Sequence, residues 1–224
     1  MKTLFLIAAY NEAETLPAVL RELVAAGQKV LVVDDGSQDG TLEVLRGFGE
    51  DVYHARHPVN LGQGAALQTG IACARLLSPD YVVTFDADGQ HRLGDAMAMI
   101  GHMDHHPELE ALVGSRFLGA TTAMPLTKRI TLKAGVLFTR LFSDIAITDT
   151  HNGLRVLRRQ FYARFSFQTT GMEHASEILD FIALNRVPFE EFPVTIDYTE
   201  YSKAKGQSWT NAFRLAIRML EEKL

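Results

Sequence analysis

The stretch Val82–His91, VVTFDADGQH, runs from an apolar segment directly into two aspartates that are one residue apart. Carboxylates at this spacing repel each other, and burying them is costly unless a positive group accompanies them. Along a strand, residues i and i+2 face the same side, so Asp86 and Asp88 are predicted to face one ligand. We therefore expect a positive group between these two side chains.

Two earlier segments end in the same way. The apolar runs TLFLIAAY (residues 3–10) and KVLVVDD (residues 29–35) lead into the polar clusters YNE and DDGS. Short, fully apolar runs are typical of strands that are buried on both faces. Helical patterns at 15–27, 39–49 and 64–77 separate the apolar runs, and a weaker strand pattern covers 51–56.

This alternation predicts an α/β fold with a mostly parallel central sheet flanked by helices. Sheets of this kind bind ligands at the carboxyl ends of their strands. The clusters YNE, DDGS and DADGQH each follow a predicted strand. We therefore expect the three clusters to meet in one crevice.

The remainder of the chain is less regular. Its pattern suggests a strand at 110–117, a helix at 127–142, a strand or turn at 150–159, a helix at 171–185, a strand at 189–198 and an amphipathic helix at 208–224.

Composition limits the class of protein. The chain has 224 residues, of which 47% are hydrophobic, enough for one buried core. A net charge of -5 argues against a nucleic-acid-binding protein, which would usually be basic. Cys73 is the single cysteine, and no stretch is long and apolar enough to span a bilayer. We expect a cytoplasmic protein, soluble or peripheral to a membrane.

The Asp86–Asp88 pair is predicted to hold Mg²⁺ or Mn²⁺. Hard divalent cations favour oxygen donors and commonly bind one or two carboxylates together with substrate phosphates. Gln90 adds another oxygen, and His91 adds a nitrogen that suits Mn²⁺ better than Mg²⁺. The alternative is a solvated acidic turn, which a D-x-D taken alone would favour.

Two further motifs are compatible with a nucleotide. Asp35 is placed to accept a hydrogen bond from a nucleobase N–H or a ribose hydroxyl, or it belongs to an ordinary turn. The glycine-rich segment NLGQGAALQTG (residues 60–70) lies where a loop meets a helix, which suits close approach to a pyrophosphate. It matches neither the dinucleotide-binding fingerprint nor the P-loop.

The motifs occur in an ordered series: AAYNEAETLP, VVDDGSQDGT, NLGQGAALQTG, DADGQH, GSR and TDTHNGLRVLRR. This series resembles family 2 glycosyltransferases of the GT-A fold, and within them the dolichol- or polyprenyl-phosphate sugar synthases. The resemblance covers nearly the whole chain and is strongest over residues 3–116. It implies an inverting, metal-dependent transfer of a sugar from a UDP- or GDP-sugar to a polyprenyl phosphate. The alternative acceptor is a sugar hydroxyl of a glycan or glycolipid.

The resemblance also implies a domain organisation. It indicates a single glycosyltransferase domain of residues 1–224, with a soft boundary near Arg116. Residues 1–116 would bind the nucleotide sugar, and residues 117–224 the acceptor. The C-terminal amphipathic helix belongs to the second half and is compatible with a position on the membrane surface.

Site residues on the donor side follow from the same resemblance. Positions that hold the nucleoside are matched by Tyr10, Glu12, Val33 and Asp35. Asp86, with the adjacent Ala87, matches the ribose and base side of the donor. Asp88 matches the main metal-contacting carboxylate, and Gln90 matches a secondary metal contact.

Catalytic residues are implied as well. Arg116 and Arg129 match cationic positions near the donor and acceptor phosphates, where they would stabilise the departing diphosphate. Asp149 is the candidate acceptor-side carboxylate, either as a base or as an orienting residue for the acceptor and Arg155. Its alternative role is to cap a turn. A sugar hydroxyl would need such a base, whereas a lipid phosphate, with a second pKa of about 6, is already largely ionised.

Three more residues complete the implied site. Glu177 matches a recurrent acidic position, with an exposed helix residue as the alternative. Lys203 and Lys205 lie in a segment that resembles a basic loop over the donor phosphates, although Thr199 and Trp209 replace expected basic residues. Outside this family, we weigh a nucleotidyltransferase, whose glycine-rich signature is missing, and a non-catalytic nucleotide-sugar-binding scaffold.

Overall fold

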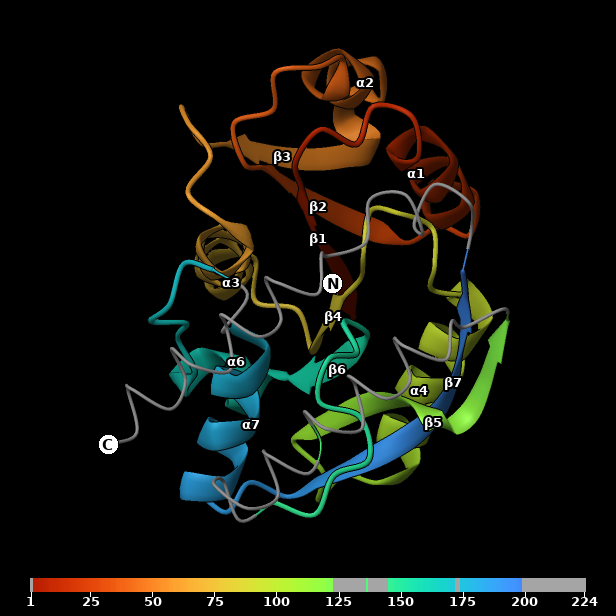
Figure 1. The fold of residues 1–224 in the computed structure, drawn as a ribbon, viewed down its shortest axis with the longest axis vertical. Helices are drawn as coiled ribbons and strands as arrows, with labels where there is room; N and C mark the ends of the chain where they lie inside the picture. The colour runs from red at the N-terminus through yellow and green to blue at the C-terminus, as the bar shows by residue number, and fades with distance from the viewer. Residues whose placement is uncertain (1, 123–135, 137–144, 172–173, 199–224) are drawn as a thin grey trace.

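The computed structural model describes residues 2–122, 136, 145–171 and 174–198 (Figure 1). Its strands are β1 (Thr3–Ala9), β2 (Lys29–Asp34), β3 (Val52–Arg56), β4 (Tyr81–Thr84), β5 (Ala111–Thr122), β6 (Arg155–Arg158) and β7 (Phe189–Asp197). Its helices are α1 (Leu16–Ala25), α2 (Thr41–Gly47), α3 (Gln63–Leu77), α4 (Leu93–His105), α6 (Arg159–Arg164) and α7 (His174–Leu184). The helices predicted at 127–142 and 208–224 lie outside the described residues.

The seven strands form one sheet in the order β3-β2-β1-β4-β6-β5-β7. β1 pairs in parallel with β2 and β4, β2 pairs in parallel with β3, and β5 pairs in parallel with β7. The short β6 lies antiparallel between β4 and β5. The predicted mostly parallel sheet is therefore confirmed, with one reversed strand that the sequence pattern did not indicate.

Alternating side chains of the strands supply two hydrophobic layers. Phe5 and Ile7 of β1 join the layer that includes side chains of α1 and α4, while Leu4 and Leu6 join the layer that includes α3, α6 and α7. Figure 1 shows α1 and α4 on one side of the sheet and α3, α6 and α7 on the other. Burial of both faces explains why the strands read as continuous apolar runs.

Three details differ from the sequence-based expectation. β4 ends at Thr84, so Asp86 and Asp88 lie in the turn that follows the strand and not on the strand itself. The helices α4 and α6 were not predicted, although the buried residues of α4, Ala96, Met99, Ile100 and Met103, follow helical spacing. Arg116 lies inside β5, so strands from both sides of the expected boundary join the same sheet.

Within the part of the chain that the structure describes, no helix is both long enough and apolar enough to cross a membrane.

Candidate active site

The polar clusters predicted to meet do lie at one edge of the sheet. β1, β2 and β4 are adjacent parallel strands, so their carboxyl ends lie side by side. The first two clusters are hydrogen-bonded to each other: the Asn11 amide donates to Ser37 Oγ at 2.9 Å, and the Gln38 amide donates to Asn11 Oδ1 at 2.8 Å. We call this region the carboxyl edge. The reversed strand β6 begins here too, since Arg155 pairs with Thr84.

Asp86 is held by groups from two other segments. Its Oδ2 accepts a hydrogen bond from Nε2 of His91 at 2.8 Å, and its side chain is 34% exposed. A Cβ placed on Gly153 would lie 2.5 and 2.6 Å from the two Asp86 carboxylate oxygens. Burial alone would raise the pKa of Asp86, but His91, His174 and Arg155 outweigh burial and hold that pKa below its usual range.

Asp88 lies in a less favourable environment. Burial and the charge of Asp86 raise the pKa of Asp88. The backbone amide of Gln90 donates to Asp88 Oδ1 at 3.1 Å, and its side-chain amide donates to Oδ2. Gln90 therefore presents its nitrogen to Asp88, and its side-chain amide would have to turn to offer oxygen to a cation.

The carboxyl edge fits a divalent cation only in part. Among the residues that the structure describes, no cluster of three or more His, Cys, Asp or Glu side chains could hold a metal by itself. Two neighbouring carboxylates and one amide oxygen nevertheless suit an ion that takes its remaining ligands from substrate phosphates and water. His91 was expected to offer a nitrogen to the metal, and this is wrong: its side chain is 2% exposed and bonded to Asp86.

The Asp35 carboxylate accepts hydrogen bonds from groups within the protein. Its Oδ1 accepts hydrogen bonds from His57 Nδ1 at 2.7 Å and the Leu61 amide at 3.0 Å, and its Oδ2 accepts one from the Gly62 amide at 2.8 Å. The side chain is 4% exposed. The direct nucleobase contact expected of Asp35 is thus largely pre-empted, and the residue organises the loop between β3 and α3.

Two further donor-side expectations need correction. Val33 is fully buried in the hydrophobic layer next to α3, and its strand is paired on both sides. The Ala87 side chain is also buried, in the layer next to α1 and α4. Both side chains therefore face the hydrophobic layers and not the edge of the sheet. Tyr10, by contrast, is 38% exposed just beyond β1, and Glu12 accepts a hydrogen bond from Thr15 Oγ1 at 2.8 Å.

The glycine-rich loop contacts protein where we expected a pyrophosphate. The amides of Gly64 and Ala65, at the start of α3, donate to the Thr170 carbonyl. Gly62, at φ +102°, and Gly64 lack Cβ atoms that would overlap the carbonyl oxygens of Thr170 and Thr169. These glycines allow two backbone segments to meet, and the amides of Gly64 and Ala65 bond to protein where a phosphate was expected.

Glu177 supports the segment that meets this loop. Its carboxylate accepts hydrogen bonds from the amides of Gln168, at 3.1 Å, and Thr169, at 2.8 Å. The residue is therefore a positioning group within the fold, which neither the acidic site role nor the exposed-helix alternative had anticipated.

Arg116 and Asp149 form a buried ion pair. Arg116 Nε lies 2.6 Å from Asp149 Oδ2, with the two side chains 7% and 0% exposed. The guanidinium also donates to Tyr198 Oη and to the His151 carbonyl. Burial lowers the pKa of Arg116, but Asp149 and Tyr198 outweigh it and raise that pKa. Both oxygens of the Asp149 carboxylate thus accept hydrogen bonds from the protein, Oδ2 from Arg116 and Oδ1 from the His151 amide.

Arg155 is a charged residue whose place the sequence did not reveal. Its side chain is almost completely buried, it donates to the Ala175 carbonyl at 3.3 Å, and its Nε has no hydrogen-bond partner. Burial lowers the pKa of Arg155 to about 10, against the opposing charges of Asp86 and Asp149. This cation therefore balances two carboxylates from different segments. Arg129, Lys203 and Lys205 lie outside the described residues.

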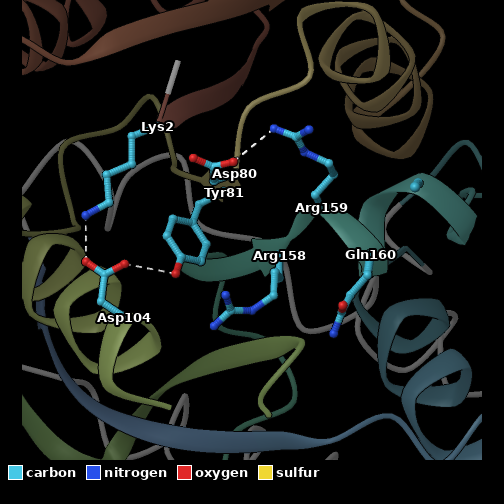
Figure 2. Close-up of a pocket in the computed structure, with 8 residues that line it drawn as sticks. Lys2, Asp80, Tyr81, Asp104, Arg158, Arg159 and Gln160 are labelled. Atoms are coloured by element: carbon cyan, nitrogen blue, oxygen red, sulfur yellow. Dashed lines mark hydrogen bonds and ion pairs between the residues drawn. The ribbon is translucent and has the colours of Figure 1, made fainter. Parts of the chain in front are cut away.

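A polar groove of about 520 Å³ lies at the opposite end of β1 and β4 (Figure 2). We call this region the amino edge. Lys2 pairs with Asp104 at 2.6 Å, Tyr81 donates to the same carboxylate at 3.0 Å, and Arg159 pairs with Asp80 at 2.9 Å. Since both carboxylates of this groove already have cationic partners, the groove is not the candidate site.

Comparison with known proteins places the chain in a family. The family model described as Glycosyl transferase family 2 matches residues 5–165. An uncharacterized protein of Methanocaldococcus jannaschii is 32% identical over 97% of this chain and 90% of its own length. UDP-N-acetylglucosamine–dolichyl-phosphate N-acetylglucosaminyltransferase of Methanococcus voltae is 31% identical over 98% of this chain and 95% of its own.

Solved structures agree on the fold. The crystal structure of S. aureus TarS 1-349 in complex with UDP-GlcNAc superposes with a TM-score of 0.64 at 15% sequence identity. The superposition covers 89% of this chain and 59% of the TarS chain. A likeness at this identity bears on the fold alone. Together with the family match, it shows that the chain belongs to glycosyl transferase family 2 and is a glycosyltransferase of the GT-A fold.

Proposed function

We propose that this glycosyltransferase moves a sugar from a nucleotide diphosphate sugar, most simply a UDP-sugar, to a polyprenyl phosphate, with inversion and with Mg²⁺ or Mn²⁺. The observation that carries the proposal is the Asp86–Asp88 pair at the carboxyl edge, where the charge of one raises the pKa of the other. The M. voltae relative, which aligns over almost the whole chain, bears the name of a UDP-sugar and dolichyl-phosphate enzyme.

The donor end of the reaction calls for positive charge. Breaking the bond between the anomeric carbon and the β-phosphate leaves negative charge on the nucleoside diphosphate. A divalent ion held by Asp88 and by Gln90 would neutralise part of that charge. At the carboxyl edge, burial and the charge of Asp86 raise the pKa of Asp88, while Arg116 pairs with Asp149. The like charges of Asp86 and Asp88 favour a bound cation.

The acceptor end favours a phosphate over a hydroxyl. A hydroxyl must lose a proton as it attacks, and the candidate base Asp149 is buried and paired with Arg116. A phosphate monoester is already largely ionised near neutral pH and needs no base. Its oxygen would attack the anomeric carbon opposite the leaving diphosphate, which gives a polyprenyl-phosphate sugar of inverted configuration and a free nucleoside diphosphate.

The setting of the reaction follows from the acceptor. A polyprenyl phosphate lies in a membrane, so we propose that the chain works as a peripheral protein at the cytoplasmic face. We also propose that residues 1–116 serve the donor and residues 117–224 the acceptor within a single domain. Arg129, Lys203 and Lys205 are proposed to meet phosphate groups.

A transfer assay tests the proposal. Purified protein is incubated in detergent with one sugar-labelled donor at a time, either UDP-GlcNAc, another UDP-sugar or a GDP-sugar. The acceptor is undecaprenyl or dolichyl phosphate. Each mixture contains Mn²⁺, Mg²⁺ or EDTA. We expect label in the organic phase with one nucleotide sugar, and no label with EDTA. Transfer only to glycan or glycolipid hydroxyls, or equal transfer in EDTA, would overturn it. Asp149→Asn adds a check, because a base role predicts loss of hydroxyl transfer with partial retention of phosphate transfer.

A further inference from the structure

We propose that His91 is a positioning residue: together with Gly153 it fixes the Asp86 carboxylate and leaves Asp88 as the carboxylate that meets the donor's metal. The inference rests on the proposed function and assigns a task to two residues that the reaction itself does not require. It also explains why a histidine that follows a D-x-D turn is buried when it could have been a ligand.

The first observation is the surroundings of His91. Its ring is 2% exposed, and its Nε2 lies 2.8 Å from Asp86 Oδ2. An ionised carboxylate only accepts hydrogen bonds, so Nε2 carries the hydrogen. The ring packs edge-on against Phe85, with centroids 5.5 Å apart, and its backbone forms a bridge with Ile196 of β7. Packing thus fixes the donor that holds Asp86.

The second observation comes from a different part of the chain. Gly153 precedes β6, and its carbonyl accepts a hydrogen bond from Thr84 Oγ1, at the end of β4, at 2.6 Å. Its Cα faces the Asp86 carboxylate so closely that a Cβ would lie 2.5 Å from Oδ2 and 2.6 Å from Oδ1. The carboxylate therefore occupies a space bounded by His91 on one segment and Gly153 on another.

The two aspartates consequently differ in how they are held. Asp86 is held by His91, just beyond the turn, and bounded by Gly153 of a distant segment. The hydrogen bonds to the Asp88 carboxylate come from Gln90, within the same turn. Fixing the first carboxylate keeps its charge at a set place beside the second, which preorganises the pair for a cation. Outer partners of this kind typically change metal affinity about 10- to 100-fold.

The test compares three variants with the intact protein. His91→Phe keeps a ring against Phe85 but removes the donor, His91→Gln keeps an N–H donor, and His102→Phe is the matched control. His102 also donates from Nε2 to a carboxylate, that of Glu190 at 2.8 Å, but at the surface between α4 and β7. Titration calorimetry measures Mn²⁺ binding in the presence of UDP, and thermal melting reports stability separately.

We expect His91→Phe to bind Mn²⁺ about 10- to 100-fold more weakly, with His91→Gln close to the wild type and His102→Phe unchanged. Equal affinity in His91→Phe and the wild type, with only the melting temperature lowered, would overturn the inference and leave the proposed function standing. A wild-type protein that binds neither Mn²⁺ nor UDP would overturn the proposed function itself.

A second variant covers the case in which His91→Phe does not fold. Gly153→Ala leaves His91 in place and intrudes on the same carboxylate from the other segment. It too must weaken Mn²⁺ binding in the presence of UDP, and unchanged affinity would contradict the inference. Gly101→Ala, at a position where an added Cβ meets nothing within 4 Å, is its matched control.

Discussion

At the amino edge both carboxylates of the groove pair with cations (Figure 2), whereas at the carboxyl edge burial and the charge of Asp86 raise the pKa of Asp88. The contrast extends to exposure. Lys2 and Asp80 are 62% and 59% exposed, while Arg116 and Asp149 are 7% and 0% exposed. The ion pairs of the amino edge are exposed to water, whereas the Arg116–Asp149 pair of the carboxyl edge is buried.

The difference indicates which edge carries the chemistry. Exposed ion pairs contribute about 0–1 kcal/mol each and are easily replaced during evolution. Repelling or buried carboxylates cost stability, and proteins tolerate such costs mainly at functional sites. The carboxyl edge therefore has the properties of a site, although a groove also lies at the other edge.

Replacing one carboxylate at each edge should give the largest difference in catalytic rate between the two edges. Asp88→Asn is expected to lower kcat/KM on the order of 1,000- to 10,000-fold, because the divalent ion loses its protein carboxylate. Asp104→Asn at the amino edge should leave the rate unchanged. Initial rates of lipid-linked product formation measure both, and comparable losses in the two variants would show that the edges do not differ in function.

Removing one cationic side chain at each edge compares how much each ion pair contributes to the free energy of unfolding. Arg116→Met leaves the buried Asp149 without its partner and should lower the free energy of unfolding by about 3–5 kcal/mol. Lys2→Met should lower it by less than about 1 kcal/mol, because that pair is exposed. Urea unfolding followed by circular dichroism measures both, and similar costs would contradict the burial contrast.

His174 gives the carboxyl edge a pH dependence. Burial and the charge of Arg155 lower the pKa of His174 to about 4, from an ordinary value of 6.5. The unfolded chain therefore binds the proton first as pH falls, so stability present above pH 6.5 is lost toward pH 4. The loss should reach about 3 kcal/mol. His174→Gln, which cannot take up that proton, should show a flatter stability profile over this window in urea titrations, and an unchanged profile would refute the assignment.

The smallest expected effect is on melting temperature, which should shift in opposite directions in the aspartate-to-asparagine variants of the two edges. The pKa of Asp88 is raised, so ionising it opposes folding, and Asp88→Asn should melt at a slightly higher temperature than wild type at pH 7. The pKa of Asp104 is lowered, mainly by its hydrogen bond with Lys2, so Asp104→Asn should melt slightly lower. The Asp88 difference should vanish below pH 3.8, the ordinary value for an aspartate, whereas the Asp104 difference should be lost only as pH falls through the lowered pKa of Asp104. Melting shifts of the same sign at pH 7 would contradict the contrast.

Local pattern sufficed for the elements that form the carboxyl edge. The strands β1, β2 and β4 are mainly apolar runs that lead into polar clusters, so the parallel sheet and the meeting of these clusters at one edge could be predicted, although Asp86 and Asp88 lie beyond the strand end. The series of motifs also identified the family correctly. Such features depend on residues that are close together in the sequence.

Features that depend on distant segments could not be predicted. The glycines at 62 and 64 fit the backbone of residues 169–170, which lie about a hundred positions later, and nothing in the glycine pattern distinguishes that contact from a phosphate. The direction of β6 is equally hidden, because a strand of four residues, RVLR, carries no signal for antiparallel pairing. His91 looked like a ligand because its burial depends on β7, far along the chain.

The central claim is that the cation and the nucleotide bind at the carboxyl edge and not at the amino edge. Amide NMR spectra of ¹⁵N-labelled protein, recorded with UDP and either Mg²⁺ or paramagnetic Mn²⁺, test it directly. We expect Mn²⁺ to broaden the amide signals of Asp88, Gln90 and Gly153 and to spare those of Lys2, Tyr81 and Arg159. Broadening centred on the second set, with the first set unaffected, would contradict it.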